Sequence, residues 1–169
     1  YHAVEAALGA DIVSYHEAHE FAETIEEMKW KTTSCCPAFV DYVSKKFPEL
    51  MDHVSKTVSP MVATARLIKS LDEDAKIVFI GPCTAKKMEI KKDDIKDAVD
   101  LVITFEELQA MLDAMNIELE KCEDSVLDNA SFYGRLFARS GGVSEAVKQV
   151  VGHEKFNVEF KPVAADGLD

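Results

Sequence analysis

Cysteines are the residues whose types and spacing most directly suggest chemistry in this sequence, because two of the four are adjacent. Cys35 and Cys36 lie in the segment "KTTSCCPAFV" (31–40) and are followed at once by a proline. Consecutive Cα atoms are about 3.8 Å apart, whereas ordinary disulfides span roughly 4.4–6.8 Å. A disulfide between these neighbours is therefore disfavoured, and both residues are predicted to act as thiols.

Cys83 has sequence surroundings similar to those of Cys36. Each follows a predicted strand and precedes a predicted helix, which begins at Pro37 in the first case and near Thr84 in the second. The carboxyl ends of parallel strands share one edge of a sheet, where ligands bind, and a helix N-terminus favours the thiolate that binds metals. The two cysteines are predicted to meet at one site, with the Lys86 ammonium about one helical turn away and directed toward an anion there.

Other reactive residue types have simpler interpretations. Cys122 is interpreted as a small hydrophobic residue, and "SGG" (140–142) as a turn, because it lacks the full glycine spacing of a phosphate-binding loop. The histidines show no metal-ligand spacing and are predicted to lie at the surface: His2, His16, His19, His53 and His153.

Short apolar runs alternate with amphipathic stretches along the chain. This alternation predicts an α/β fold, a mainly parallel β-sheet flanked by helices, as a single lobe over residues 1–169. Thr104 and Glu107 form a predicted capping box at the start of one helix. The strands are expected at 10–15, 31–35, 75–81, 100–104 and 155–163, and the helices at 16–30, 37–47, 61–71, 84–92, 104–117 and after 142.

The composition narrows the classes of partner and compartment. The chain has 169 residues, with Lys+Arg 19 against Asp+Glu 31 and a net charge of −12, which argues against nucleic acid as a partner. No apolar run approaches the ~20 residues of a membrane span, and no signal peptide opens the sequence. Four cysteines are too few for a secreted disulfide scaffold, so a reducing, cytoplasmic location is predicted.

Two cysteine signatures together resemble the catalytic domain of the iron-only (FeFe) hydrogenases. They are "TSCCPAF" (33–39) and "PCTAK" (82–86), the latter followed by Glu89. The segments "ALGADIVSYHEAHEF", "FPELMDHVSKTVSPM" and "ARSGGVSEAV" extend the resemblance over the whole chain. Because the sequence begins at Tyr1 without a methionine and ends in "DGLD", it is expected to be the N-terminal part of that domain, one lobe of a longer protein.

The resemblance implies a role for each cysteine in the signatures. Cys36 and Cys83 would bind a 4Fe–4S cubane, and Cys35 would donate and accept protons beside a di-iron subcluster. The cubane and the subcluster together form the H-cluster of the family. Lys86 would hydrogen-bond a cyanide ligand of the subcluster.

The resemblance also implies a proton relay and a cofactor pocket. The relay would run from Cys35 through Glu17, Ser55 and Glu20, while Pro60 and Pro82 would lie at the cofactor. Some positions depart from the family pattern and indicate a divergent branch: Gly81 for a methionine, Met61 for a glutamine, and Ala38-Phe39 for Gly-Trp.

A third family signature, which supplies two more cysteines, is absent from this sequence. With two of the four cubane ligands, the isolated chain is expected to bind no cofactor, to be inactive, and to expose Cys35 and Cys36 as thiols at a sheet edge. The full-length parent is expected to reduce protons reversibly with electrons from ferredoxin or fused ferredoxin-like domains, completed by the C-terminal remainder of the domain. The alternatives are a hydrogenase-like iron–sulfur protein acting as a sensor or in cluster assembly, and a generic α/β domain with structural thiols.

Overall fold

The computed structural model describes residues 2–163, which form two compact units. The first unit joins the described residues up to Ala63 with those from Asp128 onward, and the second comprises Thr64–Leu127. Each unit is described by itself. Helix α3 (Pro60–Leu71) begins in the first unit and ends in the second.

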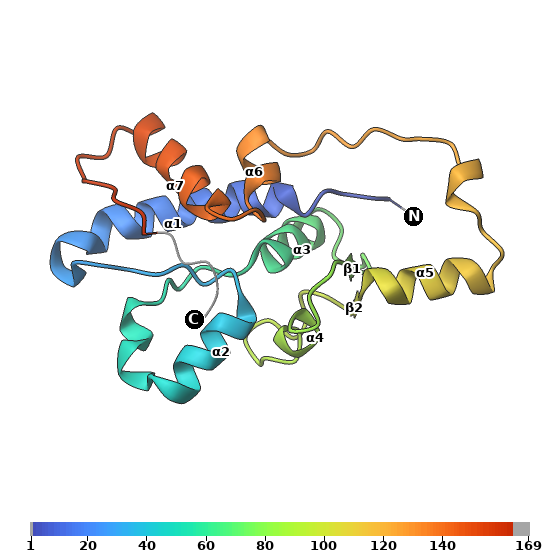
Figure 1. Cartoon of the computed structure of the whole chain (residues 1–169), viewed down its shortest axis with the longest axis horizontal. Coiled ribbons are helices and arrows are strands. Elements are labelled where there is room, and N and C mark those ends of the chain that lie inside the picture. Colours follow the sequence, from blue (N-terminus) through green and yellow to red (C-terminus); the bar gives the residue numbers. More distant parts are fainter. Residues whose placement is uncertain (1, 164–169) are drawn as a thin grey trace. The chain divides into compact units, whose positions relative to one another are not determined.

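The first unit is built around helix α1 (Ala7–Met28), with α6 (Phe132–Leu136) and α7 (Gly142–His153) packed along it (Figure 1). Small and branched side chains at helical spacing let these helices approach closely. One core cluster contains Ala10, Val13, Ala63, Phe137 and Ala146, and a second contains Ala18, Val147 and Val151.

The strands predicted at both ends of this unit are wrong. Residues 10–15 belong to α1, because Ala10 and Val13 continue the buried helical stripe that includes Ala18. Residues 155–163 form no strand; the Phe156 and Phe160 side chains instead pack against the second core cluster. Apolar runs of this length are compatible with several structures, and packing decides among them.

The segment between α1 and α3 carries the adjacent cysteines. It contains α2 (Pro37–Lys46), which Pro37 opens as predicted, and the 3₁₀ helix η1 (Pro48–His53). The predicted strand at 31–35 is reduced to one parallel bridge between Thr32 and Val54, so the cysteine pair does not lie at the edge of a sheet. This bridge places the chain before Cys35 beside the chain after η1.

The second unit confirms a parallel sheet, although a small one. Strand β1 (Val78–Ile80) pairs with β2 (Leu101–Ile103), and Thr104 caps α5 (Phe105–Ala114) through the predicted capping box with Glu107. The helix predicted at 84–92 is only α4 (Lys86–Glu89), because i→i+3 turns replace α-helical bonds on both sides of it. The 3₁₀ helix η2 (Leu119–Lys121) follows α5.

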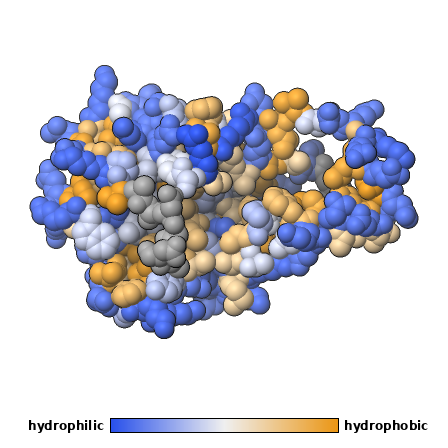
Figure 2. Space-filling model, viewed as in Figure 1, coloured by the Kyte–Doolittle hydropathy of each residue, from blue (hydrophilic) through white to orange (hydrophobic). Residues whose placement is uncertain are grey.

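Apolar side chains reach the surface of the second unit over α5 and the turn that follows it (Figure 2). They do not contribute to the buried core of the described residues, which in this unit includes Ile95, Val99 and Val102. The exposed set is Phe105, Met111, Met115 and Leu119.

The "SGG" segment is a turn, as predicted, and it yields a test of packing. Gly141 has a positive φ of 73°, and a Cβ on Gly142 would lie 1.9 Å from the Leu136 carbonyl oxygen. Gly142→Ala is therefore expected to lower the free energy of unfolding by roughly 1–3 kcal/mol. Gly152→Ala, in the same helix with nothing within 4 Å of its Cβ, should instead be neutral or stabilising by up to about 1 kcal/mol.

Chemical denaturation of the two alanine variants measures this difference. Equal unfolding free energies for Gly142→Ala and Gly152→Ala would contradict the close approach of α7 to the end of α6.

Candidate functional site

Helix α1 directs two carboxylates, one turn apart, toward the segment that follows η1. Glu17 is 5% exposed, and its Oε1 accepts hydrogen bonds from the Ser34 N–H at 3.3 Å and the Thr57 hydroxyl at 3.1 Å. Its Oε2 is buried and has no hydrogen-bond partner among the described residues. Glu17 is thus a buried carboxyl group in which only Oε1 accepts hydrogen bonds from described residues.

Glu20 lies nearer the surface and is more fully bonded. Its Oε2 accepts the Ser55 hydroxyl at 2.5 Å, and its Oε1 accepts the Lys56 N–H at 3.0 Å. The Lys31 ammonium lies 2.7 Å from Oε1. These contacts stabilise the charged form of the carboxylate.

Hydroxyl groups connect the two carboxylates. Ser55 Oγ lies 3.0 Å from Thr57 Oγ1, which in turn bonds Glu17. The structure therefore brings together Glu17, Ser55 and Glu20, which were predicted from the resemblance, and adds Thr57 and Ser34, which were not. The spacing of Ser55 and Thr57 was the available signal, because residues i and i+2 of an extended segment point to the same side.

The surroundings move the pKa values of the two carboxyl groups in opposite directions. Burial raises the pKa of Glu17 to about 7, against the opposing effect of hydrogen bonds from Ser34, Thr57 and, to a smaller extent, Ser55. Burial alone would also raise the pKa of Glu20, but the Lys31 ammonium, the Ser55 hydroxyl and the Lys56 N–H outweigh it and lower that pKa. Near neutral pH, Glu17 can exchange a proton while Glu20 is ionised.

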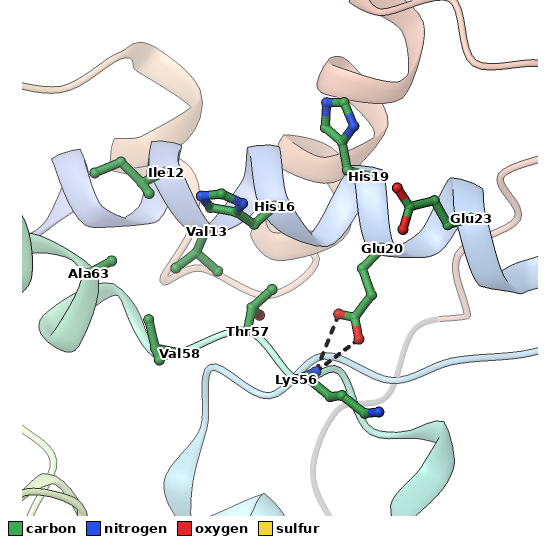
Figure 3. Close-up of a pocket in the computed structure, with 10 residues that line it drawn as sticks. All are labelled: Ile12, Val13, His16, His19, Glu20, Glu23, Lys56, Thr57, Val58 and Ala63. Carbon is green, nitrogen blue, oxygen red and sulfur yellow. Dashed lines mark hydrogen bonds between the residues drawn. The ribbon is translucent and has the colours of Figure 1, made fainter. Parts of the chain in front are cut away.

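The outer end of this arrangement opens into a pocket of about 500 Å³ (Figure 3). Glu20 and Thr57 line it beside the α1 side chains His16, His19 and Glu23. The remaining lining residues are Ile12, Val13, Lys56, Val58 and Ala63. The pocket gives solvent a route to Glu20, whereas Glu17 is not among its lining residues.

Two of the histidines predicted at the surface are partly buried. His19 packs between Tyr15 and Phe156, with ring centroids 4.4 Å and 4.8 Å away. His53 stacks on Trp30 at 3.9 Å. Aromatic partners that are distant in sequence cover both rings, which the spacing of the histidines alone does not reveal.

The adjacent cysteines have different surroundings. Cys36 is exposed and is the N-cap residue of α2, whereas Cys35 is half-buried and packs against the core cluster that contains Val13. The Ser34 N–H bond to Glu17 ties α1 to the residue before Cys35. The two thiols are thus presented differently, which suits two different roles.

The other predicted site residues begin α3 or lie in the second unit. Pro60 opens α3, while Cys83 is half-buried in the turn between β1 and α4 and Pro82 beside it is exposed. The Lys86 ammonium lies 2.7 Å from Glu89 Oε2, and both residues are buried. Because α4 is a single turn, it offers Cys83 a weaker helix terminus than predicted. The meeting of Cys36 and Cys83 stays a prediction.

Within the described part of the chain, no group of three or more His, Cys, Asp or Glu side chains is placed to hold a metal ion. The four cysteines, all of them described, are thiols. Cys122 is exposed at the end of η2, so the prediction of a small buried hydrophobic residue is wrong for it.

Comparison with known proteins shows similarity over nearly the whole chain. The family model "Iron only hydrogenase large subunit, C-terminal domain" matches residues 1–168. Iron hydrogenase 1 of Clostridium pasteurianum is 34% identical over 92% of this chain and 30% of its own length. The periplasmic Fe hydrogenase large subunit of Nitratidesulfovibrio vulgaris is 29% identical over 99% of this chain and 45% of its own length.

A second kind of relative and a solved structure complete the comparison. The cytosolic Fe-S cluster assembly factor NAR1 of Kluyveromyces lactis is 38% identical over 52% of this chain and 19% of its own length. The structure of apo FeFe-hydrogenase HydA1 from Chlamydomonas reinhardtii matches with a TM-score of 0.73 and 30% identity over 87% of this chain and 42% of that one. The chain spans less than half the length of each of these relatives.

Proposed function

Because this chain belongs to the iron-only hydrogenase large-subunit family, we propose that it forms part of a longer enzyme that interconverts protons, electrons and hydrogen. One observation supports this reaction most directly. The chain holds a buried carboxyl group, Glu17, joined through hydroxyls to a second carboxylate, Glu20, that lines a solvent-accessible pocket. Such an arrangement moves protons between water and a buried site.

Different residues of the site carry out different steps of the proposed proton transfer. Glu20 exchanges protons with solvent in the pocket, and Glu17 holds a proton near neutral pH because burial raises its pKa to about 7. Cys35, half-buried and next to the Ser34 N–H that bonds Glu17, is the thiol at the inner end of the relay. Cysteine and carboxyl groups can each donate and accept a proton without a change of fold.

The donors present fit the H-cluster of the family in part. Cys36 is an exposed thiol at a helix N-terminus, and with Cys83 it would hold the 4Fe–4S cubane, which takes four ligands. When bound, the cluster with its di-iron subcluster would supply a route for electrons from the donor and the reactive centre for hydrogen chemistry. The buried Lys86 would offer a hydrogen bond to an anionic ligand, with Pro60 and Pro82 beside the cofactor.

The proposal includes the partners that such an enzyme needs. Electrons would come from ferredoxin or fused ferredoxin-like domains, and the remainder of the catalytic domain would supply the other cluster ligands. We place the enzyme in the cytoplasm, where few cysteines are oxidised. No helix among residues 2–163 is both long and apolar enough to cross a membrane. The isolated chain would carry no iron and have no activity.

Activity of the matured protein tests the proposal. The longest protein that carries this sequence is produced anaerobically with the hydrogenase maturation system and supplied with reduced viologen or ferredoxin. It is expected to evolve hydrogen and to show infrared stretches from CO and CN ligands. A protein that shows these stretches at full iron loading but evolves no hydrogen would contradict the proposed reaction.

The similarity to NAR1 favours a second candidate, an iron–sulfur protein that acts in cluster assembly. An assembly factor has no evident need for a continuous hydroxyl link between two carboxylates, so this candidate ranks second. The same infrared spectra separate the two candidates. Cubane iron without CO or CN stretches, together with cluster transfer to an apo-acceptor, would support the assembly role.

A further inference from the structure

We infer that Thr57 is a relay residue in this chain, because its hydroxyl connects Glu17 to Ser55 and lets one proton pass between the two carboxyl groups. This inference rests on the proposed function and extends it to a specific residue. Neither the two cysteine signatures nor the relay residues implied by the resemblance include Thr57. The contacts around its side chain carry the argument.

Oxygen–oxygen contacts join the two carboxyl groups without a break. Glu17 Oε1 lies 3.1 Å from Thr57 Oγ1, which lies 3.0 Å from Ser55 Oγ. Ser55 Oγ lies 2.5 Å from Glu20 Oε2. Hydrogen bonds between hydroxyl and acceptor oxygens span about 2.5–3.0 Å, so two of these contacts lie at the limits of the range and the Glu17–Thr57 contact lies just above it. Ser55 itself has a smaller effect on the pKa of Glu17 than Thr57 has. The best-formed hydrogen-bonded path between Glu17 and Glu20 through described side chains therefore passes through Thr57.

A count of hydrogen atoms shows what completes the path. Each of its oxygen–oxygen contacts needs one hydrogen, and the Ser55 and Thr57 hydroxyls supply one each. When Ser55 donates to Glu20 and Thr57 donates to Glu17, no hydrogen lies between the two hydroxyl oxygens. One added proton, on either carboxyl group, fills that contact. The two carboxyl groups with their hydroxyls are thus suited to hold a single shared proton.

The transfer balances without any other reactant. At the start the Glu17 carboxyl donates to Thr57, Thr57 donates to Ser55, and Ser55 donates to Glu20. Each proton then moves one oxygen along, so three O–H bonds break and three form. At the end Glu20 is the acid, Glu17 is the carboxylate, and both hydroxyls are restored with reversed donor direction.

Backbone contacts hold Thr57 in place for this role. Its carbonyl accepts the Ser34 hydroxyl at 2.6 Å, and its N–H donates to Ser55 Oγ at 3.2 Å. The parallel bridge between Thr32 and Val54 aligns the two segments that carry these groups. The path is therefore already assembled in the folded chain.

The titratable side chains around the path lie at its outer end. Lys31 pairs with Glu20, and Lys56 donates its N–H to the same carboxylate. His16, His19 and Glu23 line the adjoining pocket (Figure 3). Glu20 can therefore exchange protons with solvent, and the Thr57 hydroxyl connects it, through Ser55, to the buried Glu17.

Turnover by the matured protein tests the link, with rates expressed per loaded centre. Thr57→Val keeps the shape of the side chain but removes the hydroxyl, and it should lower hydrogen turnover on the order of tenfold or more. Thr57→Ser restores a hydroxyl and should recover most of the rate. Thr64→Val, a matched change at a buried threonine of α3 outside the path, should leave the rate unchanged. A Thr57→Val rate within twofold of the parent, or a Thr57→Ser rate as low as that of Thr57→Val, would overturn the inference.

Infrared titration of the carboxyl groups tests the link independently of activity. The C=O stretch of protonated Glu17 is assigned by its loss in Glu17→Gln. In Thr57→Val the pH midpoint of this band should move upward, because a hydrogen bond that favours the charged form is lost. If the midpoint does not move, the proposed hydrogen bond from Thr57 to Glu17 is wrong, whether or not the parent evolves hydrogen. If the midpoint moves but the parent evolves no hydrogen, only the proposed reaction is contradicted.

Discussion

Matured protein carrying Cys36→Ala is expected to lose most of its bound iron and at least on the order of 100-fold in hydrogen turnover. Cys36 is an exposed thiol at the N-cap position of α2 and belongs to the first cysteine signature, which the family resemblance assigns to cluster binding. Because a cubane takes four ligands, loss of one protein thiolate leaves the cluster incompletely held. Iron and sulfide content per chain, measured together with hydrogen evolution, reports this effect.

Cys122→Ala is the matched control for the loss of a thiol. Cys122 is also exposed, but it belongs to neither cysteine signature. Its Sγ lies 3.6 Å from the carbonyl oxygen of Glu118, the residue before η2. Both variants remove an exposed side chain, so in the iron-free form the unfolding free energy of each should stay within about 0.5 kcal/mol of the parent. Full iron content in the Cys36 variant would contradict its assignment as a cluster ligand.

Glu17→Gln is expected to flatten the pH dependence of stability and to reduce proton transfer. Burial raises the pKa of Glu17 from 4.5 to about 7, so between these pH values the folded chain binds a proton that the unfolded chain releases. The stabilising effect of this proton is fully present below pH 4.5 and is lost as the pH rises through 7. The parent should lose roughly 2–3 kcal/mol across this window from this residue alone.

Glutamine is neutral at every pH, so this part of the pH dependence should be absent from the Glu17→Gln variant. Above pH 7 the variant should be more stable than the parent, because it buries no charge and keeps an oxygen to accept from Ser34 and Thr57. Matured protein should retain its iron but lose on the order of 100-fold or more in hydrogen turnover, since the amide cannot release a proton. Urea unfolding at a series of pH values measures the first effect, and hydrogen evolution the second.

Glu20→Gln is a control with the opposite sign. The Lys31 ammonium and the Ser55 hydroxyl overcome the effect of burial and lower the pKa of Glu20, so its charged form stabilises the folded chain above pH 4.5. Glu20→Gln should therefore lower stability at neutral pH, where Glu17→Gln raises it. Parallel pH curves for the parent and Glu17→Gln would show that Glu17 is not a buried acid.

The sequence by itself determined the family and several local structures. Both cysteine signatures lie within residues 1–168, which the family model matches. Pro37 at the start of α2 and the Thr104–Glu107 capping box depend on contacts within a few residues, so they were predicted in place. The i,i+3 spacing of Glu17 and Glu20 also placed them on one face of a helix.

Tertiary structure decided the features that depend on distant partners. Residues 10–15 form helix because Ala10 and Val13 share a buried core cluster with Phe137, at the end of α6, and Ala146, in α7, both more than a hundred residues away in the sequence. The sequence of a short apolar run does not identify such distant partners, so it cannot distinguish helix from strand. The same ambiguity explains the incorrect strand prediction for residues 155–163.

The role of Thr57 shows the same limit at the site itself. Its place between Glu17 and Ser55 depends on the bridge of Thr32 with Val54, which aligns two segments separated by α2 and η1. The sequence shows that residue 57 carries a hydroxyl, whereas only the folded structure shows which oxygen atoms lie within hydrogen-bond distance of it. A proton path consists of such oxygen–oxygen contacts, and each hydrogen bond in it requires its two oxygen atoms to lie within about 3 Å of each other.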